Sequence, residues 1–308
     1  MRVAFDSRPS ADPRGVGRYA RCLLRALRDT ADAHGEIVET HRPRQADVYH
    51  APWMQGAMLR SPCPMVVTLH DLAPLKRRSE HLRAGMRSRL RHLAVQRAMG
   101  VIVPTETVAH DAVVRLGVER ERLVVIAEAP DPAMYPRTDA EIARVRERYG
   151  LPERYLVWVG CLRHPDPRKH VAQLASTPRE LPLVLVGPTR PWAHELPDVI
   201  LTGHVPDEHL AAIYAGAHAL VLPSQDEGFG LPAVEALACG TPVVTCDIPA
   251  LREVLHERAT FVEPGDLRAL ILAAETVRGP APAPPSWTWE DAGRATWGVY
   301  ERAMAACR

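Results

Sequence analysis

The chain of 308 residues is 46% hydrophobic and 24% charged with a formal net charge of +1, a composition that is typical of globular proteins and excludes disordered or fibrous ones. Its charge is uneven: residues 1–150 hold 25 Lys and Arg against 18 Asp and Glu, whereas residues 151–308 hold 13 against 19. The acidic second half argues against a nucleic-acid partner, and the basic first half points to an anionic surface as its partner.

Cysteine usage and hydropathy predict a cytoplasmic protein. The six cysteines lie far apart, with no Cys-x-x-Cys pair and no spacing with histidine that would suit a metal. The N-terminus has no apolar signal core. The longest apolar stretch, Leu210 to Pro223, is shorter than the roughly 20 residues that cross a bilayer.

Short apolar runs alternate with amphipathic segments along the whole chain. Strands that are apolar throughout and alternate with helices predict α/β parallel sheets covered on both faces. We expect strands at Val3–Phe5, Val48–His50, Met65–Leu69, Val101–Val103, Val124–Ile126, Leu156–Val159, Leu183–Val186, Val199–Leu201, Leu220–Leu222 and Val243–Thr245.

A first helix is predicted because six apolar residues fall on one face at helical spacing: Val16, Tyr19, Ala20, Leu23, Leu24 and Leu27. The glycine-bearing turn Arg14-Gly15-Val16-Gly17 is expected to lead into it. A basic segment, Lys76 to Arg97, follows later in the first half and holds eight Lys and Arg against Glu80 alone.

Helical spacing of five apolar residues makes this basic segment an amphipathic helix; they are Leu82, Met86, Leu90, Leu93 and Ala94. One interpretation is a solvated basic face over a buried apolar stripe. The other is peripheral contact with an anionic membrane, where each basic residue contributes about 1 kcal/mol.

A polar helix predicted at 139–149 leads to the turn residues Gly150-Leu151-Pro152, after which a fresh βα series starts. We therefore expect an N-terminal domain of residues 1–150 and a C-terminal domain of residues 151–286. A proline-rich break at 279–285 ends the second series. The final segment, 287–308, is predicted to be a helix capped by Thr288 that packs back on the first domain.

Segment 220–240 has the pattern of a strand, a loop and a helix. Gly228 and Gly230 are expected to place backbone amides at the start of the helix, where the helix dipole favours an anion. Glu227 and Glu235 flank these amides, and a carboxylate accepts hydrogen bonds from two vicinal hydroxyls. A nucleotide sugar suits this arrangement; the alternative is a glycine loop with two solvated glutamates.

Two other segments carry possible chemistry. Arg168 and Lys169 are adjacent and follow the strand at 156–159. Such a basic pair can bind a diphosphate, and the alternative is that both side chains are only solvated. His70 and Asp71 end the strand at 65–69, where a histidine donates to a substrate hydroxyl or braces a loop. No nucleophile elbow and no lysine-containing phosphate loop occurs.

Together these segments resemble the retaining glycosyltransferases of family 4, which have the GT-B fold of two Rossmann-like parallel-sheet lobes facing across a cleft. The most specific part is Ser-x-x-Glu-Gly-Phe-Gly-Leu-Pro-x-x-Glu, from Ser224 to Glu235, and the likeness covers nearly the whole chain. It also includes the segments 15–19, 47–50, 68–72, 159–160, 168–169, 185–187, 202–207 and 286–287.

The resemblance implies a role for each matching residue on the donor side. Arg168 and Lys169 neutralise the donor diphosphate, Glu227 contacts the donor sugar and Glu235 holds the ribose. The backbone amides that cap the phosphates belong to Gly228, Phe229, Gly230 and Leu231. Protein cations and amides supply the electrostatic stabilisation, so no metal and no cofactor are expected.

On the other lobe the resemblance places catalytic His70 near the hydroxyls of the sugar, with Asp71 and Tyr19 on the acceptor side. Gly15 and Gly17 form the glycine loop at the donor, and Val205 meets the base through its backbone. The loop from Gly160 to Arg168 departs from the family pattern, so Arg163 is an alternative phosphate ligand, and His170 stands where asparagine or glycine is common. The first lobe is short between Thr40 and Asp47, which leaves the acceptor undefined.

The function implied is transfer of a hexose, of the mannose or glucose type, with retention, from a nucleotide diphosphate sugar to a hydroxyl of a glycan, glycolipid or small acceptor. GDP-mannose and UDP-glucose are the leading donors. Two alternatives stay open: a sugar-nucleotide epimerase with the GT-B fold, and a non-catalytic protein that binds a nucleotide sugar.

Overall fold

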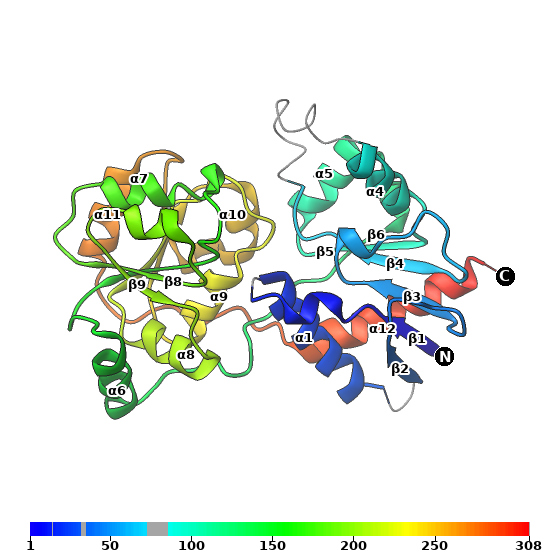
Figure 1. Cartoon of the computed structure of the whole chain (residues 1–308), viewed down its shortest axis with the longest axis horizontal. Coiled ribbons are helices and arrows are strands. Elements are labelled where there is room, and N and C mark those ends of the chain that lie inside the picture. The colour runs from blue at the N-terminus through cyan, green and yellow to red at the C-terminus, as the bar shows by residue number, and fades with distance from the viewer. Residues whose placement is uncertain (14, 32–34, 73–85, 308) are drawn as a thin grey trace. The chain divides into compact units, whose positions relative to one another are not determined.

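The computed structural model describes residues 1–13, 15–31, 35–72 and 86–307, which form two compact units (Figure 1). Unit 1 comprises Met1–Glu128 with Trp287–Arg308, and unit 2 comprises Ala129–Ser286. The division falls earlier than the boundary expected at Gly150. The helix that precedes Gly150 belongs to unit 2 because it packs on another helix of that unit, and Arg146 donates from Nη2 to the Gly216 carbonyl at 3.0 Å.

Unit 1 contains a six-stranded sheet in which every neighbouring pair is parallel. The order β2-β1-β3-β4-β5-β6 reverses direction between β1 and β3. Its strands are β1 (Arg2–Phe5), β2 (Glu36–Glu39), β3 (Val48–Ala51), β4 (Met65–Thr68), β5 (Gly100–Val103) and β6 (Leu123–Val125). Its helices are α1 (Gly15–Asp29), α4 (Met86–Gln96), α5 (Glu106–Leu116) and α12 (Trp289–Ala305), with short 3₁₀ turns η1 (Arg8–Ala11), η2 (Met54–Gly56) and η3 (Arg120–Arg122).

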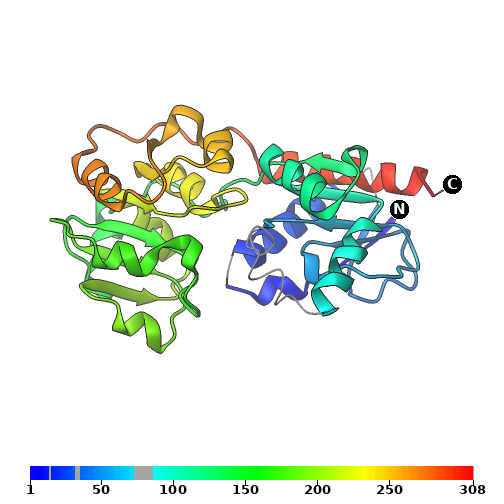
Figure 2. The same cartoon turned by 90° about the horizontal axis from the view of Figure 1, so that it is seen from above.

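The C-terminal helix α12 lies beside α1 and contacts β3, β4 and β5, as Figures 1 and 2 show in red. Thr288 caps it: its hydroxyl accepts from the Asp291 amide at 3.1 Å, and the Asp291 carboxylate accepts in turn from Thr288. Trp297 is fully buried and donates to the Leu27 carbonyl at 3.3 Å. The last helix is therefore an integral part of unit 1.

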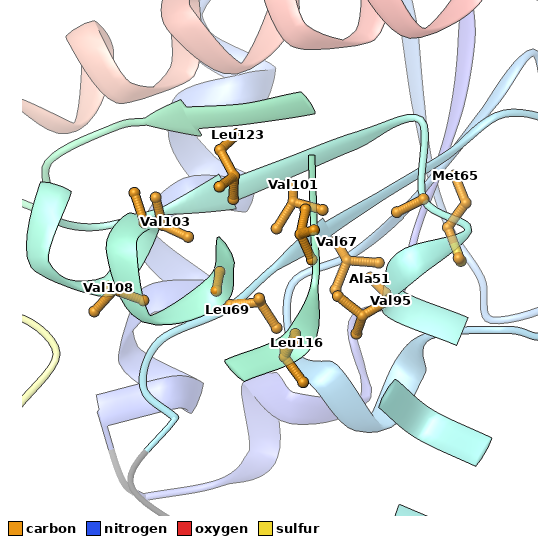
Figure 3. Close-up of a cluster of buried hydrophobic side chains, with 14 of the residues drawn as sticks. Ala51, Met65, Val67, Leu69, Val95, Val101, Val103, Val108, Leu116 and Leu123 are labelled. Atoms are coloured by element: carbon orange, nitrogen blue, oxygen red, sulfur yellow. The ribbon is translucent and has the colours of Figure 1, made fainter. Parts of the chain in front are cut away.

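The core that holds the strand ends of unit 1 in place lies between the sheet and the helices α4 and α5 (Figure 3). Val67, Val101 and Val103 point from neighbouring strands toward Leu116 of α5 and Val95 of α4. These strands carry apolar residues on both faces because helices cover both faces.

Unit 2 contains a second six-stranded parallel sheet, with the order β12-β11-β10-β7-β8-β9. Its strands are β7 (Leu156–Val159), β8 (Leu183–Val186), β9 (Val199–Gly203), β10 (Ala219–Leu222), β11 (Val243–Cys246) and β12 (Thr260–Val262). Its helices are α6 (Asp139–Tyr149), α7 (Val171–Ser176), α8 (Asp207–Ala215), α9 (Leu231–Ala238), α10 (Pro249–Leu255) and α11 (Leu267–Thr276), with 3₁₀ turns η4 (Pro167–Lys169), η5 (Pro191–Glu195) and η6 (His256–Arg258).

All ten predicted strands exist, so the prediction of parallel α/β sheets is confirmed. The two strands that the sequence did not reveal, β2 and β12, lie at sheet edges. Both are partly exposed, and they lack the continuous apolar run that identifies a central strand. In the part of the chain that the structure describes, no helix combines the length and apolarity needed to cross a membrane.

One local prediction is wrong, because Gly15 and Gly17 do not form a separate turn before the first helix but lie in its first turn. Of the two interpretations of the basic segment, the structure does not favour a buried apolar stripe, since Leu90 and Leu93 of α4 are 39% and 47% exposed while Ala94 is buried. Leu82 and the rest of 73–85 lie outside the described residues.

Candidate functional site

The switch point of the unit 2 sheet gathers most of the predicted donor residues. Strand order reverses between β7 and β10, and open α/β sheets bind ligands beyond the carboxyl ends of the strands at such a point. Arg168 and Lys169 lie in η4, after β7, and Glu227 lies in the loop after β10. The Gln225 amide donates to the Arg168 carbonyl at 2.9 Å, so a backbone hydrogen bond joins the two loops.

Lys169 and Glu227 form an ion pair at this switch point. Nζ of Lys169 donates to Oε1 of Glu227 at 2.9 Å, and the two side chains are 29% and 16% exposed. Burial by itself would lower the pKa of Lys169, but the Glu227 carboxylate outweighs it and raises that pKa. The ammonium is therefore charged, and its hydrogen bond to Glu227 uses one of its three N–H groups.

Arg168 is fixed by Asp166, a residue that the sequence reasoning missed. Nε and Nη2 of Arg168 donate to the two carboxylate oxygens of Asp166 at 3.0 and 2.7 Å. Asp166 also caps η4 by accepting from the Arg168 amide at 3.0 Å. Burial would raise the pKa of Asp166, yet its hydrogen bonds with Arg168 lower it, so the carboxylate stays ionised. Arg163 is exposed.

His170 follows this pair with a φ of +46°, in the left-handed region. Only glycine enters that region freely, with asparagine next, because a Cβ crowds the neighbouring carbonyl. The chain needs this conformation to turn from η4 into α7. The geometry explains why asparagine or glycine is common at this position in the family that the sequence resembles.

The glycine segment after β10 forms the start of α9. Gly230 is the N-cap residue, with a φ of +90°, and the helix begins at Leu231. Gly228, Phe229, Gly230 and Leu231 are all buried. The first backbone amides of a helix have no partner within it, and the helix dipole makes this end attractive to an anion.

Two further predicted donor residues, Glu235 and Val205, have buried side chains. Glu235 of α9 is only 2% exposed, and its Oε2 accepts from the Tyr214 hydroxyl at 3.4 Å. Val205 lies between β9 and α8, and its side chain is buried. Its predicted contact with the base therefore has to use its backbone. The roles of both residues stay predictions.

In unit 1, His70 follows β4 and has a partner on each ring nitrogen. Nε2 donates to the Pro52 carbonyl at 2.9 Å, and Nδ1 lies 3.1 Å from Oε1 of Glu128. Burial would lower the pKa of His70, but the Glu128 carboxylate and the Pro52 carbonyl outweigh it and raise that pKa. Because both partners accept hydrogen bonds, the site favours the imidazolium form. The sequence reasoning missed Glu128.

Tyr19 and Gly17 of unit 1 have packing roles. Tyr19 is 4% exposed, its hydroxyl lies 3.1 Å from that of Thr68, and its ring packs edge-on against His70 at 4.5 Å between centroids. This burial argues against a direct contact of Tyr19 with the acceptor. A Cβ on Gly17 would lie 1.9 Å from the Asp12 carbonyl oxygen, so α1 needs glycine there.

Asp71 is half-buried beside His70, and Gly15 is exposed at the start of α1. The acceptor role of Asp71 stays a prediction, as does the donor role of Gly15. Within the described ranges, no three His, Cys, Asp or Glu side chains gather in a way that would hold a metal ion. The expectation that no metal or cofactor is needed also stays a prediction.

The sequence did not identify Asp6, a polar residue of unit 1, as a candidate site residue. Asp6 is fully buried directly after β1 and accepts hydrogen bonds from Arg8 and Trp53. Its position in the sequence could have identified it, because Asp6 directly follows an apolar strand, the same pattern that identified His70 as a candidate.

Two family models match the chain, one in each half. The family described as Glycosyltransferase Family 4 matches residues 3–133, and the one described as Glycosyl transferases group 1 matches residues 153–278.

The proteins with similar sequences include a mannosyltransferase and a glucosyltransferase. O-antigen chain mannosyltransferase B of Escherichia coli is 27% identical over 290 residues, which span 82% of this chain and 74% of that protein. The 2-deoxystreptamine glucosyltransferase of Streptomyces kanamyceticus is 28% identical over 208 residues, spanning 61% of this chain and 54% of that protein. The chain thus spans about half the length of the second relative.

Solved structures share the fold over the whole chain. Sucrose-phosphate synthase of Thermosynechococcus elongatus has a TM-score of 0.70 and 22% identity, with 99% of this chain and 94% of that chain covered. HepE of Anabaena, in complex with UDP and glucose, has a TM-score of 0.69 and 18% identity, with 100% and 98% covered. The predicted GT-B fold class, with two Rossmann-like parallel-sheet units, is confirmed.

Proposed function

This chain belongs to the glycosyltransferases of family 4, and we propose that it transfers a hexose from a nucleotide diphosphate sugar to a hydroxyl group. The hexose is mannose or glucose, and the acceptor is a glycan, a glycolipid or a small molecule. A mannosyltransferase and a glucosyltransferase among the similar proteins support the hexose, and the UDP and glucose held by HepE support a nucleotide-sugar donor.

The observation that carries the proposal is the Lys169–Glu227 ion pair at the switch point of unit 2, beside the N-terminus of α9. Bond cleavage leaves negative charge on the departing diphosphate. Lys169 and the amides at the start of α9 are fixed donors for that charge, and fixed donors stabilise a transition state without reorganising. Arg168 and Arg163 are the two candidates for a further phosphate contact, and in this assignment no metal is required.

Glu227 holds the donor sugar in this assignment. Lys169 orients the Glu227 carboxylate, which accepts hydrogen bonds from the hydroxyls of the donor sugar. The Lys169 ammonium also binds the diphosphate. One ion pair therefore holds both the sugar and the diphosphate of the donor. Glu235 holds the ribose in this assignment, whereas the catalytic role of His70 stays a prediction, because both of its ring nitrogens already have partners. We assign retention at the anomeric carbon on the strength of the motif from Ser224 to Glu235.

The enzyme further contacts anionic membranes through the segment Lys76 to Arg97, on the cytoplasmic side. The support is α4, where Leu90 and Leu93 are exposed next to Arg89 and Arg91. Apolar side chains among basic ones are the surface that enters the interface of an anionic bilayer. An acceptor that is lipid-linked would then be presented at this surface.

Donor binding is tested by thermal unfolding of the full chain with UDP-, GDP-, ADP- and dTDP-sugars. A bound donor stabilises by RT ln(1 + [L]/Kd), which is about 2.7 kcal/mol at a hundredfold excess over Kd. We expect one base to shift the midpoint and Glu227→Ala to abolish transfer with the fold intact. No shift with any donor, or full transfer by Glu227→Ala, contradicts the proposal.

Turnover of the donor with and without an added acceptor separates the alternative functions. An epimerase turns over its sugar nucleotide without an acceptor, and a binding protein shows a shift with neither transfer nor hydrolysis. Transfer that depends on an added acceptor is the result expected here.

A further inference from the structure

Unit 1 has a built polar site of its own, at the switch point of its sheet. The order β2-β1-β3 places the carboxyl ends of β1 and β3 side by side where the strand order reverses, the position at which such sheets bind ligands. Asp6 follows β1 directly, and Trp53 follows β3. Nε1 of Trp53 donates to Oδ2 of Asp6 at 2.9 Å, which joins the two strand ends.

Asp6 is a buried carboxylate whose oxygens are already occupied. It accepts from Nε and Nη2 of Arg8, both at 2.7 Å, from Trp53, and from the Tyr49 hydroxyl at 3.4 Å. Gly56 makes room for it, because a Cβ there would lie 2.6 Å from Oδ2 of Asp6. With no exposed surface and no open acceptor position, Asp6 positions Arg8 and does not itself bind a ligand.

Arg8 is consequently a fixed guanidinium with one open edge. Nε and Nη2 form the edge that faces Asp6, while the side chain is 48% exposed. The side-chain hydrogen bonds of Arg8 to Asp6 come from Nε and Nη2, and the Tyr49 hydroxyl also interacts with the guanidinium and helps to raise the pKa of Arg8. The guanidinium carbon lies 5.9 Å from the centroid of the Trp53 ring, which limits its movement on one side. The outer edge thus presents parallel N–H donors in a fork, a geometry that matches the two oxygens of a carboxylate or phosphate.

We propose that Arg8, held by Asp6 and flanked by Trp53, binds an oxyanion on the acceptor, either a phosphate or a carboxylate. This proposal rests on the proposed function, since it specifies the acceptor of that reaction. The open edge offers donors alone, which suits an oxyanion better than a hydroxyl that must also donate.

Two further observations agree with an anionic acceptor. The residues of unit 1 hold 24 Lys and Arg against 17 Asp and Glu, so its field attracts anions. The site is also continuous with the predicted catalytic histidine, because Pro52, which precedes Trp53, accepts from His70 at 2.9 Å. An acceptor anchored on Arg8 is therefore held within the same group of strand ends as His70.

The test is calorimetric titration of the full chain with mannose 6-phosphate, glucuronate and methyl α-mannoside. The two acids separate phosphate from carboxylate, and the glycoside is the neutral reference. We expect at least one acid to bind ten or more times more tightly than the glycoside. Arg8→Gln should remove that difference, and Arg8→Lys should restore only part of it, because an ammonium keeps the charge but loses the fork.

Arg28→Gln is the matched control, since Arg28 is also half-exposed and paired with a carboxylate, Glu39, in the same unit. It should bind the acids like the wild type. Equal binding of acids and glycoside by the wild type, or undiminished acid binding by Arg8→Gln, overturns the proposal.

Oxyanion binding at the donor site is distinguished with Lys169→Gln. If Lys169→Gln no longer binds the two acids while Arg8→Gln still binds them, the acceptor proposal fails and the proposed function stands. Far-UV circular dichroism and urea unfolding that match the wild type show that Arg8→Gln and Arg8→Lys are folded, and a retained donor-induced thermal shift shows that their donor site is intact. Absence of any donor shift in the wild type contradicts the proposed function, whatever the acids do.

Discussion

Lys169 and Glu227, which lie 58 positions apart in the sequence, meet at 2.9 Å between Nζ and Oε1. Their ion pair joins the loop after β7 to the loop after β10 at the point where the unit 2 sheet reverses its strand order. One cation and one carboxylate, each oriented by the other, thereby occupy the place where a nucleotide sugar is expected to bind.

Lys169→Gln should lower kcat by roughly 100- to 1,000-fold, the usual effect of removing one fixed donor to transition-state charge. Both side chains are mostly buried, and the variant leaves the Glu227 carboxylate without its cation, so the free energy of unfolding should also fall, by about 3 kcal/mol. Steady-state transfer kinetics and urea unfolding measure the two effects. Asp247→Asn breaks the pair with Arg252 on the surface of the same unit and should leave kcat unchanged. A Lys169→Gln enzyme with normal kcat would exclude the assigned role.

His70 and Glu128 should make the stability of unit 1 depend on pH. The folded-state pKa of His70 is raised above its ordinary value of 6.5, so the stabilisation is fully present below about pH 6.5 and is lost as pH rises through the raised pKa. Glu128→Gln should therefore destabilise more at pH 6 than at pH 9 in urea unfolding. His110→Gln, at an exposed position of α5, serves as the control and should leave the pH dependence as it is. An equal loss at both pH values would show that the pair does not stabilise the charged imidazole.

Gly187→Ala should disrupt the donor site from a distance. Gly187 follows β8 with a φ of +141°, and a Cβ there would lie 1.8 Å from the carbonyl oxygen of Gly160, where the loop to Arg168 begins. Gly240→Ala is the matched control: its φ is +82°, but a Cβ meets nothing within 4 Å. We expect Gly240→Ala to cost about 1–2 kcal/mol of backbone strain. Gly187→Ala should cost more and weaken the donor-induced thermal shift, and equal effects of the two variants would contradict this explanation.

Membrane contact should depend on the exposed leucines of α4. Sedimentation with vesicles that contain anionic lipid should capture the wild-type chain, with binding that falls as salt rises. The double variant Leu90→Ser and Leu93→Ser should bind at least fivefold more weakly. Leu272→Ser, at a position that is 62% exposed in unit 2, should bind like the wild type. Sedimentation that does not change with anionic lipid or with the two α4 substitutions would exclude α4 as the membrane-binding surface.

The fold could be predicted from the sequence wherever burial is two-sided. Central strands such as β7 and β8 are continuous apolar runs and were predicted with the bounds that the structure has. The edge strands β2 and β12 have solvent on part of their surface, so their composition carries no comparable signal. Leu90 and Leu93 keep helical spacing although they are exposed, because periodicity identifies an apolar face without identifying what covers it.

The sequence by itself determined the two parallel-sheet units and the chemical identity of the donor residues, because apolar runs, glycines and the spaced glutamates are local patterns. Only the tertiary structure decided the distant partners, Glu227 on Lys169 and Glu128 on His70, each pair 58 positions apart. The physical reason is that parallel sheets bring strand ends together from distant parts of the chain. Asp166 and Asp6 lie only two positions from the arginines that they orient, and there the conformation of the loop after the strand decided the contact.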